Sequence, residues 1–235
     1  MRLFFISICS LVLFSSCNAQ FDKLLKKVLK TDLSTEDVAA GLKEALSNGT
    51  SKGSDLLSQK DGYFKSIYKI YLPEDAKNVC NKLRVIPGFN SIEDEVIEKL
   101  NRAAEDAAVK AKPIFLNAIK QMTIADAWNI LKGADNSATT YLHKTTNQPL
   151  YNEFKPIITE SMEKVGAIKL WSSAVNKYNQ IPFVSKANPD MSDYVTNKAL
   201  EGLFKKIEEE EKDIRHNLAL RTTDLLKRVF SQQDK

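Results

Sequence analysis

Few residues of this chain have the types and spacing that catalysis requires. The two histidines, His143 and His216, belong to no HExxH pair or other zinc-ligand spacing, so we expect no metal site. The chain contains no Gly-x-Ser-x-Gly, Walker or dinucleotide-binding glycine pattern, and no cofactor is predicted. A serine or cysteine nucleophile would depend on those histidines or on a distant carboxylate as its base. The sequence therefore favours a non-enzymatic protein.

A run of four carboxylates, Glu208 to Glu211, is the most concentrated acidic feature. Successive helical positions turn by about 100°, so Glu208 and Glu211 can share one face but all four cannot. Lysine and arginine residues lie three or four positions away, which favours a solvated helix face with salt bridges. A cation site of the carboxylate-bundle type would need Glu-x-x-His, which is absent.

Six other polar residues define a candidate polar cleft. Arg102 and Glu105 lie in an alanine-rich stretch that is expected to be buried, and buried charges must be paired. They predict either an interhelical ion pair or a polar ligand pocket. Tyr178 and Asn179 precede Ile181-Pro182-Phe183 and could line a cleft or fix a turn. The candidate cleft consists of Arg102, Glu105, Tyr178, Asn179, Asp193 and Arg221.

The composition indicates the elements that must position these residues. Of 235 residues, 43% are hydrophobic and 27% are charged, which is typical of a globular protein. Only 8 glycines and 7 prolines are present, too few for the many turns of a sheet. We expect an all-α fold of about nine helices with no significant sheet, in a single domain over residues 33–230 followed by a tail at 231–235.

Apolar spacing and cap residues locate the helices. Ser34 and the acids after it begin one helix, whose end the stretch 49–53 loosens. Residues 63–72 form the only plausible extended segment, and Pro113 interrupts the chain. Cys80 is expected to be a buried small hydrophobe. Further helices are expected at residues 73–83, 91–111, 135–143, 148–165, 167–178 and 192–216.

A weak internal repeat relates two central stretches. Lys112-Pro113-Ile114 recurs 43 residues later as Lys155-Pro156-Ile157, and Trp128 recurs as Trp171 at the same offset. This spacing is compatible with a duplicated helix pair or with chance similarity between amphipathic helices. It suggests that the central region packs as two related hairpins.

The first 19 residues have the pattern of an export signal. The apolar run from Leu3 to Phe14 is well short of the ~20 residues that span a bilayer. Cleavage before Cys17, with lipidation of that cysteine, is one interpretation, and ordinary cleavage after Ala19 is the other. Both predict an exported protein of the periplasm, which in the first case would be lipid-anchored to the outer membrane.

Residues 20–32 are expected to form a basic amphipathic segment that precedes the helical domain. Apolar residues fall at helical spacing between Phe21 and Leu29, with lysines on the other side. The stretch is expected to contact a membrane surface, to pack as a first helix or to serve as a tether. The net charge of +4 is too small for a dedicated nucleic-acid binder. The lysines are Lys23, Lys26, Lys27 and Lys30.

Seven blocks of the mature chain form a pattern together: LSTEDVAAGLKEAL at 33–46, LNRAAE at 100–105, KPIF at 112–115, IKQMTI at 119–124, YNQIPFV at 178–184, DYVT at 193–196 and RTTDLLK at 221–227. These blocks resemble the bacterial exported family catalogued as domain of unknown function 4197. The resemblance covers about residues 33–230 and implies a helical, signal-bearing, often lipoprotein-like protein without an assigned activity.

Taken together, these features predict an envelope protein with a non-enzymatic interaction or ligand-binding role. Its partner would be a membrane surface, an envelope protein or a small ligand, and not a nucleic acid. Two alternatives stay open. A metal-independent hydrolase would use carboxylates gathered in a helical cleft, and a carrier would enclose an apolar molecule between helices.

Overall fold

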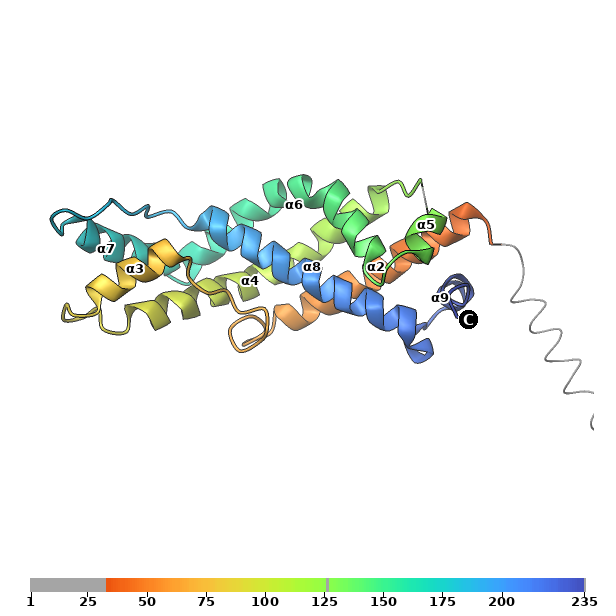
Figure 1. Cartoon of the computed structure of the whole chain (residues 1–235), viewed down its shortest axis with the longest axis horizontal. Coiled ribbons are helices and arrows are strands. Elements are labelled where there is room, and N and C mark those ends of the chain that lie inside the picture. The colour runs from red at the N-terminus through yellow and green to blue at the C-terminus, as the bar shows by residue number, and fades with distance from the viewer. Residues whose placement is uncertain (1–32, 126, 235) are drawn as a thin grey trace, which may run out of the picture.

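The computed structural model describes residues 33–125 and 127–234, and it is an antiparallel bundle of four long helices. α2 (Thr35–Leu57) and α6 (Ser137–Lys164) run in one direction, and α4 (Ile92–Gln121) and α8 (Ser192–His216) run in the other (Figure 1). α2 and α6 each pack between α4 and α8. This is the up-down-up-down arrangement of a four-helix bundle.

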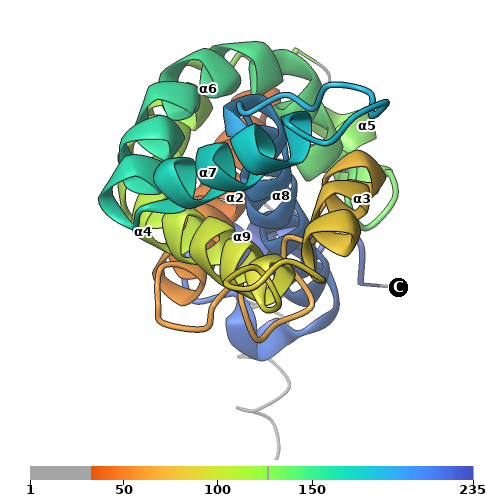
Figure 2. The same ribbon diagram turned by 90° about the vertical axis from the view of Figure 1, so that its left-hand side faces the viewer.

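Short helices cover the two ends of the bundle. α3 (Glu74–Leu83) and α7 (Ala167–Asn179) pack together at one end. α5 (Ala127–Lys132), the turn η1 (Leu218–Leu220) and α9 (Asp224–Phe230) lie at the other end, where α2 also begins (Figure 1). Figure 2 looks onto the α3–α7 end. The all-α prediction is confirmed: the described residues contain eight α-helices and no strand.

α2 begins where its cap residues predict. The Ser34 hydroxyl accepts the Asp37 N–H at 3.0 Å, and the Asp37 carboxylate accepts the Ser34 N–H at 3.3 Å, which completes a capping box. The expectation that residues 49–53 loosen the end of this helix was wrong, because α2 continues to Leu57.

The glycines of α2 let it approach its neighbours closely. A Cβ atom at Gly49 would lie 3.2 Å from the Glu210 Cβ of α8, and one at Gly53 would lie 3.2 Å from the Lys206 Cγ. Their lack of side chains therefore sets the short separation of α2 and α8. Tertiary packing, rather than helix propensity, keeps these residues helical.

Prolines lie inside two of the long helices, so the interruptions predicted at Pro113 and between residues 143 and 148 were wrong. Pro113 in α4, and Pro149 and Pro156 in α6, are all exposed. A proline leaves one carbonyl of the preceding turn without its N–H donor. On an exposed side water can bind that carbonyl and the helix can bend, and Figure 1 shows that α6 is curved.

The repeated residues lie in equivalent places. Pro113 is inside the long helix α4, and Trp128 is in the short helix α5 that follows it. Pro156 is inside α6, and Trp171 is in the following short helix α7. Each repeat unit is thus a long helix with an internal proline followed by a short helix with a tryptophan.

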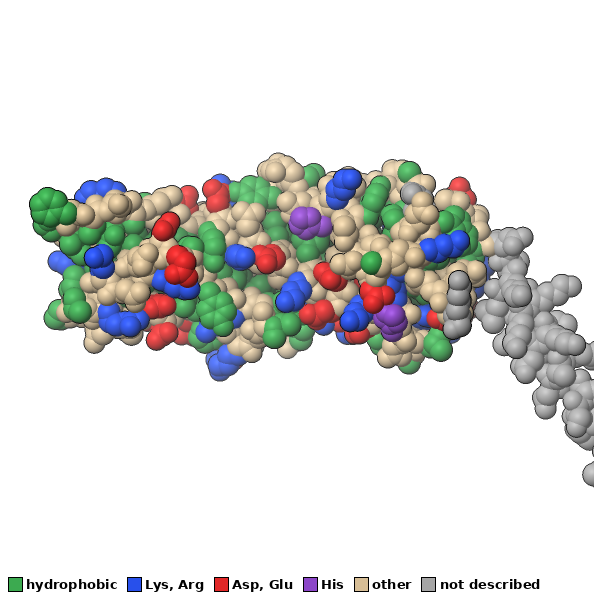
Figure 3. All heavy atoms as spheres, viewed as in Figure 1, with side chains coloured by type: hydrophobic (Ala, Val, Ile, Leu, Met, Phe, Trp, Pro, Cys, Tyr) green, Lys and Arg blue, Asp and Glu red, His purple; other side chains and the backbone are tan. Residues whose placement is uncertain are grey.

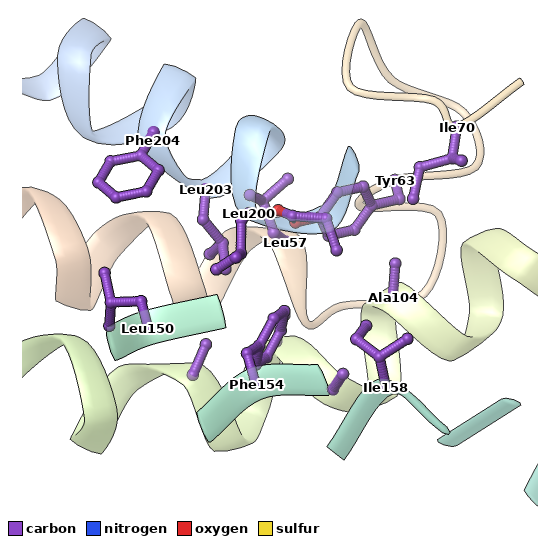
Figure 4. Packing of buried hydrophobic residues seen from close by; sticks show 14 of the residues in the cluster. Leu57, Tyr63, Ile70, Ala104, Leu150, Phe154, Ile158, Leu200, Leu203 and Phe204 are labelled. Carbon is purple, nitrogen blue, oxygen red and sulfur yellow. The ribbon is translucent and has the colours of Figure 1, made fainter. Parts of the chain in front are cut away.

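The buried side chains form one continuous core from α2 to α9. In its middle, Phe154 of α6 and Leu200 of α8 point toward one another, and Tyr63 enters from the loop after α2 (Figure 4). Full burial of one such side chain stabilises the fold by about 1.5–3 kcal/mol. Cys80 is buried as predicted, and burial raises the pKa of its thiol to about 11. None of the described helices has the length and apolarity needed to cross a membrane.

Candidate functional site

Arg102 and Glu105 attach a loop to the bundle. Glu105, 4% exposed, accepts the N–H groups of Tyr63 and Phe64 at 3.1 and 3.0 Å and an Arg102 N–H at 2.7 Å. Arg102 also pairs with Asp61 at 2.8 Å and lies over the Phe64 ring. The predicted ion pair therefore exists, but within α4, and Asp61 provides the link to another segment. The same hydrogen bond from Arg102 lowers the pKa of Asp61.

Asn101 reinforces this attachment and was missed in the sequence. Its side chain accepts the Ile70 N–H at 2.8 Å and donates to the Ile70 carbonyl at 2.8 Å and to the Ile97 carbonyl at 2.7 Å. Residues 63–72, expected to be extended, are instead an irregular loop without strand pairing. The amide side chain satisfies backbone groups that a neighbouring strand would satisfy in a sheet.

Arg221 lies at the opposite end of the bundle and is fully buried. It donates to the carbonyls of Ile214 and Arg215 at 3.0 and 2.8 Å, near the C-terminus of α8, and pairs with Asp234 at 2.8 Å. Asp234 belongs to the expected tail, so this part of the tail contacts the domain. Arg221 caps a helix end and does not line a cleft.

Asp193 connects α8 to α6. Its carboxylate lies 2.6 Å from the Lys155 ammonium and accepts the Tyr151 hydroxyl, on the exposed side of both helices. The hydrogen bonds from Lys155 and Tyr151 lower its pKa. The structure thus separates Arg102 and Glu105, Arg221 and Asp193 into three different surroundings, and these four residues do not form one cleft.

The acidic run of α8 is only partly solvated, so the predicted solvated face needs correction. Glu210 and Glu211 are 4% and 1% exposed. Glu211 pairs with Arg215 at 2.7 Å, and Glu210 pairs with Lys206 at 2.9 Å. The predicted ion pairs are present, but two of the four carboxylates lie inside the bundle. Within the described residues no group of His, Cys, Asp or Glu side chains is arranged to hold a metal ion.

The two histidines are exposed and lie apart. The His143 ring packs edge-on against Phe204 with a centroid separation of 4.6 Å. His216, the last residue of α8, places its Nε2 2.8 Å from the Asp135 carboxylate. Neither histidine forms a hydrogen bond with a serine, threonine or cysteine side chain in the part of the chain that the structure describes.

A groove of about 960 Å³ opens at the α3–α7 end, and Tyr178 lines it. One wall is α3, and the other is the loop between α7 and α8. Figure 2 shows these two segments at the same end of the bundle. Its size is within the range of sites that bind small molecules. The lining contains neither histidine nor cysteine. Besides Tyr178, it includes Asp75, Asn78, Val79, Lys82, Trp171, Phe183, Lys186, Asp190 and Met191.

Asn179 and Trp171 fix the loop wall of the groove. The Asn179 amide accepts the Ala187 N–H at 2.9 Å and donates to the Ala187 carbonyl at 3.3 Å. The Trp171 indole donates to the Asn188 carbonyl at 3.2 Å. Of the candidate cleft, therefore, Tyr178 and Asn179 are brought together, one lining the groove and the other fixing its wall.

Phe183, on the rim of this groove, has an unusual conformation. Its φ is +63°, in the left-handed region that bulky residues rarely adopt, and its side chain is 106% exposed. Asp61, the other described non-glycine residue with positive φ, is held by its pairs with Arg102 and Lys65. Figure 3 shows hydrophobic side chains at the tip of this end of the molecule. Strained exposed residues of this kind cluster at ligand-binding sites.

The fold and this groove define a four-helix bundle with an open, partly polar recess between the short helices at one end. A family model described as a protein of unknown function, DUF4197, matches residues 32–231, and the chain belongs to this family. No curated protein and no solved structure matches the chain.

Proposed function

We propose that this protein is an exported envelope protein that binds a small ligand in the groove between α3 and the α7–α8 loop, without transforming it. The observation that carries the proposal is the groove of about 960 Å³ with the strained, fully exposed Phe183 on its rim. Its floor is formed by buried apolar side chains and its rim by amides and charges. This combination is typical of a binding pocket.

The place of the groove in the fold agrees with a tether at the other end. The described chain begins at Leu33, at the end of the bundle opposite the groove (Figure 1). A lipid on Cys17 would therefore attach the chain on the side of the domain opposite the groove. Palmitate labelling of the full chain in its host tests the anchor. Label that persists after Cys17→Ala would contradict it.

Ligand binding is tested by native mass spectrometry of the protein purified from its own host. We expect a small molecule bound in a one-to-one ratio, and we expect Asn78→Trp to reduce its occupancy. Asn78 is an exposed residue of α3 that lines the groove, so the larger side chain fills space there. Asn152→Trp, on exposed α6 surface outside the groove, is the matched control.

A fluorescence experiment gives a second measurement. The chain has two tryptophans, so Trp128→Phe leaves Trp171 of the groove as its single reporter. The ligand extracted from the protein purified from its host, when added to this ligand-free variant, should change the fluorescence emission of Trp171. Two results together would refute the groove as a ligand site: the purified protein retains no molecule, and Asn78→Trp changes the binding of no component of the host extract.

A further inference from the structure

α3 presents a charge gradient to the groove. Asp75, Asn78, Val79 and Lys82 all line it, at the spacing i, i+3, i+4 and i+7 that places residues on one helix face. The helical rise of about 1.5 Å per residue separates Asp75 from Lys82 by about 10 Å along the axis. Neither side chain has an ion-pair partner among the described residues. One wall therefore carries a carboxylate at one end and an ammonium at the other.

The opposite wall repeats this polarity. The Tyr194 hydroxyl donates to the Tyr71 carbonyl at 2.7 Å, which places the start of α8 beside the start of α3. Asp190 lies two residues before the start of α8 and is at this end, where its carboxylate accepts the Ser192 N–H at 2.8 Å. Lys186 lies beside the C-terminal end of α7, where it donates to the Asn179 carbonyl.

The groove therefore has an acidic end with Asp75 and Asp190 and a basic end with Lys82 and Lys186. Between these ends the floor is apolar and almost completely buried. Its exposed fractions are 2% for Val79, 2% for Trp171, 5% for Met191 and 7% for Tyr178.

We propose that the ligand is a short peptide of about three residues with free termini and an apolar central side chain; this inference rests on the proposed function. An extended chain advances about 3.3–3.6 Å per residue, so three residues span about 10 Å. The amino terminus lies at the acidic end and the carboxylate at the basic end. A simple amphipathic anion would use the basic end alone, and a neutral apolar molecule would use only the floor.

The test uses the tripeptide Ala-Leu-Ala, its N-acetyl and C-amide forms, and the uncharged form with both changes. Binding is measured by titration calorimetry and by Trp171 fluorescence in the Trp128→Phe background. We expect acetylation and amidation each to weaken binding about fivefold, which corresponds to the upper range for an exposed ion pair. Both penalties should shrink as salt is raised, because the charged groups of the rim are exposed.

Variants assign each terminus to its end of the groove. Lys82→Gln should reduce the loss of binding on amidation and leave the loss on acetylation unchanged, and Asp75→Asn should do the reverse. Asp224→Asn and Lys227→Gln, exposed residues of α9 at the opposite end of the bundle, should change neither penalty. Peptides of two and five residues should bind more weakly than the tripeptide.

The outcomes separate the inference from the proposed function. Equal binding of the free, acetylated and amidated peptides would overturn the zwitterionic ligand. Failure of every peptide to bind would overturn it too. The proposed function stands in both cases if the molecule retained from the host still loses occupancy in Asn78→Trp. If no molecule is retained and Asn78→Trp also changes the binding of no extract component, both proposals fail.

Discussion

Glu211 of α8 connects to α6 through its buried carboxylate and to α5 through Arg215. Its replacement by alanine therefore tests the contribution of buried charged groups to the stability of the bundle. It accepts the N–H groups of Ala138 and Thr139 at 3.0 and 2.7 Å, and the Thr139 hydroxyl at 2.7 Å, at the start of α6. It also accepts two N–H groups of Arg215 at 2.9 and 2.7 Å. Arg215 in turn donates to two carbonyls at the end of α5, at 2.7 and 3.2 Å.

The expected loss of stability follows from the buried groups that Glu211→Ala leaves without a partner. Arg215, 4% exposed, would remain buried without its carboxylate, and breaking a buried pair costs about 3–5 kcal/mol. The two freed N–H groups at the start of α6 add to the cost, although partial relaxation and water reduce it. We expect a loss of about 4 kcal/mol in the free energy of unfolding. A typical domain has about 5–15 kcal/mol, so the variant should fold with a small remaining margin.

Urea unfolding followed by circular dichroism at 222 nm measures this loss. Glu208→Ala is the matched control, because Glu208 belongs to the same acidic run but accepts only an exposed Asn136 amide at 3.1 Å; it should cost less than about 0.5 kcal/mol. Arg215→Ala and the double variant complete a mutant cycle, and the double variant should cost at least about 2 kcal/mol less than the sum. A Glu211→Ala variant within 1 kcal/mol of the wild type would refute the reasoning.

Three further predictions concern other parts of the fold. Gly202→Ala should lower the free energy of unfolding by about 1–3 kcal/mol in the same urea assay, because its Cβ would lie 2.8 Å from the Tyr63 ring. The hydrogen bond from Arg221 holds the pKa of Asp234 below its usual range, so this carboxylate stabilises the folded state above about pH 4, and the contribution disappears as the pH falls through the folded pKa. The stability difference between wild type and Asp234→Asn, measured by urea unfolding from pH 7 to pH 2, should therefore narrow on acidification; a constant difference would contradict this pairing. In a chain beginning at residue 20, Cys80 should resist iodoacetamide at pH 8 until urea is added, because its thiol is buried and has a pKa of about 11.

Helix boundaries with strong local signals were predictable from the sequence. Both bounds of α8, residues 192 and 216, agree with the prediction, and Ser34 begins α2 through its capping box. The start of α2 depends on a side chain that bonds to the nearest turn of backbone, so a local sequence pattern contains the whole cause. Gly166, with φ +74°, separates α6 from α7 for the same kind of reason.

Helix continuity through prolines and glycines was not predictable by the same rules. Pro113 disfavours a helix locally, but Phe115, two positions further on, is buried, and its contacts with the core keep α4 continuous. The glycines of α2 did offer a usable signal. Gly41, Gly49 and Gly53, with Ala45, recur every four residues and mark one smooth face of a helix.

The partners of the buried charged residues could not be predicted from the sequence, because they come from distant segments of the chain. The burial of Arg221 depends on Asp234, in a stretch expected to be a tail. The burial of Glu211 depends on backbone N–H groups of α6, which have no sequence signature. A charged residue in an apolar pattern predicts only that some partner exists.

Only one wall of the groove could be predicted from the sequence. The stripe of Asp75, Asn78, Val79 and Lys82 is readable as one polar face of a short helix, and on its own it resembles any solvated surface. It becomes a wall only because the α7–α8 loop, about 110 residues further along the chain, is held opposite it by Asn179 and Trp171. If the charges at the two ends of the groove recognise the two termini of a peptide, the hydrogen bonds that hold the α7–α8 loop should affect peptide affinity as strongly as the charged side chains do. Asn179→Ala should then weaken the binding of Ala-Leu-Ala and of its uncharged form by the same factor, whereas Lys82→Gln weakens only peptides with a free carboxylate.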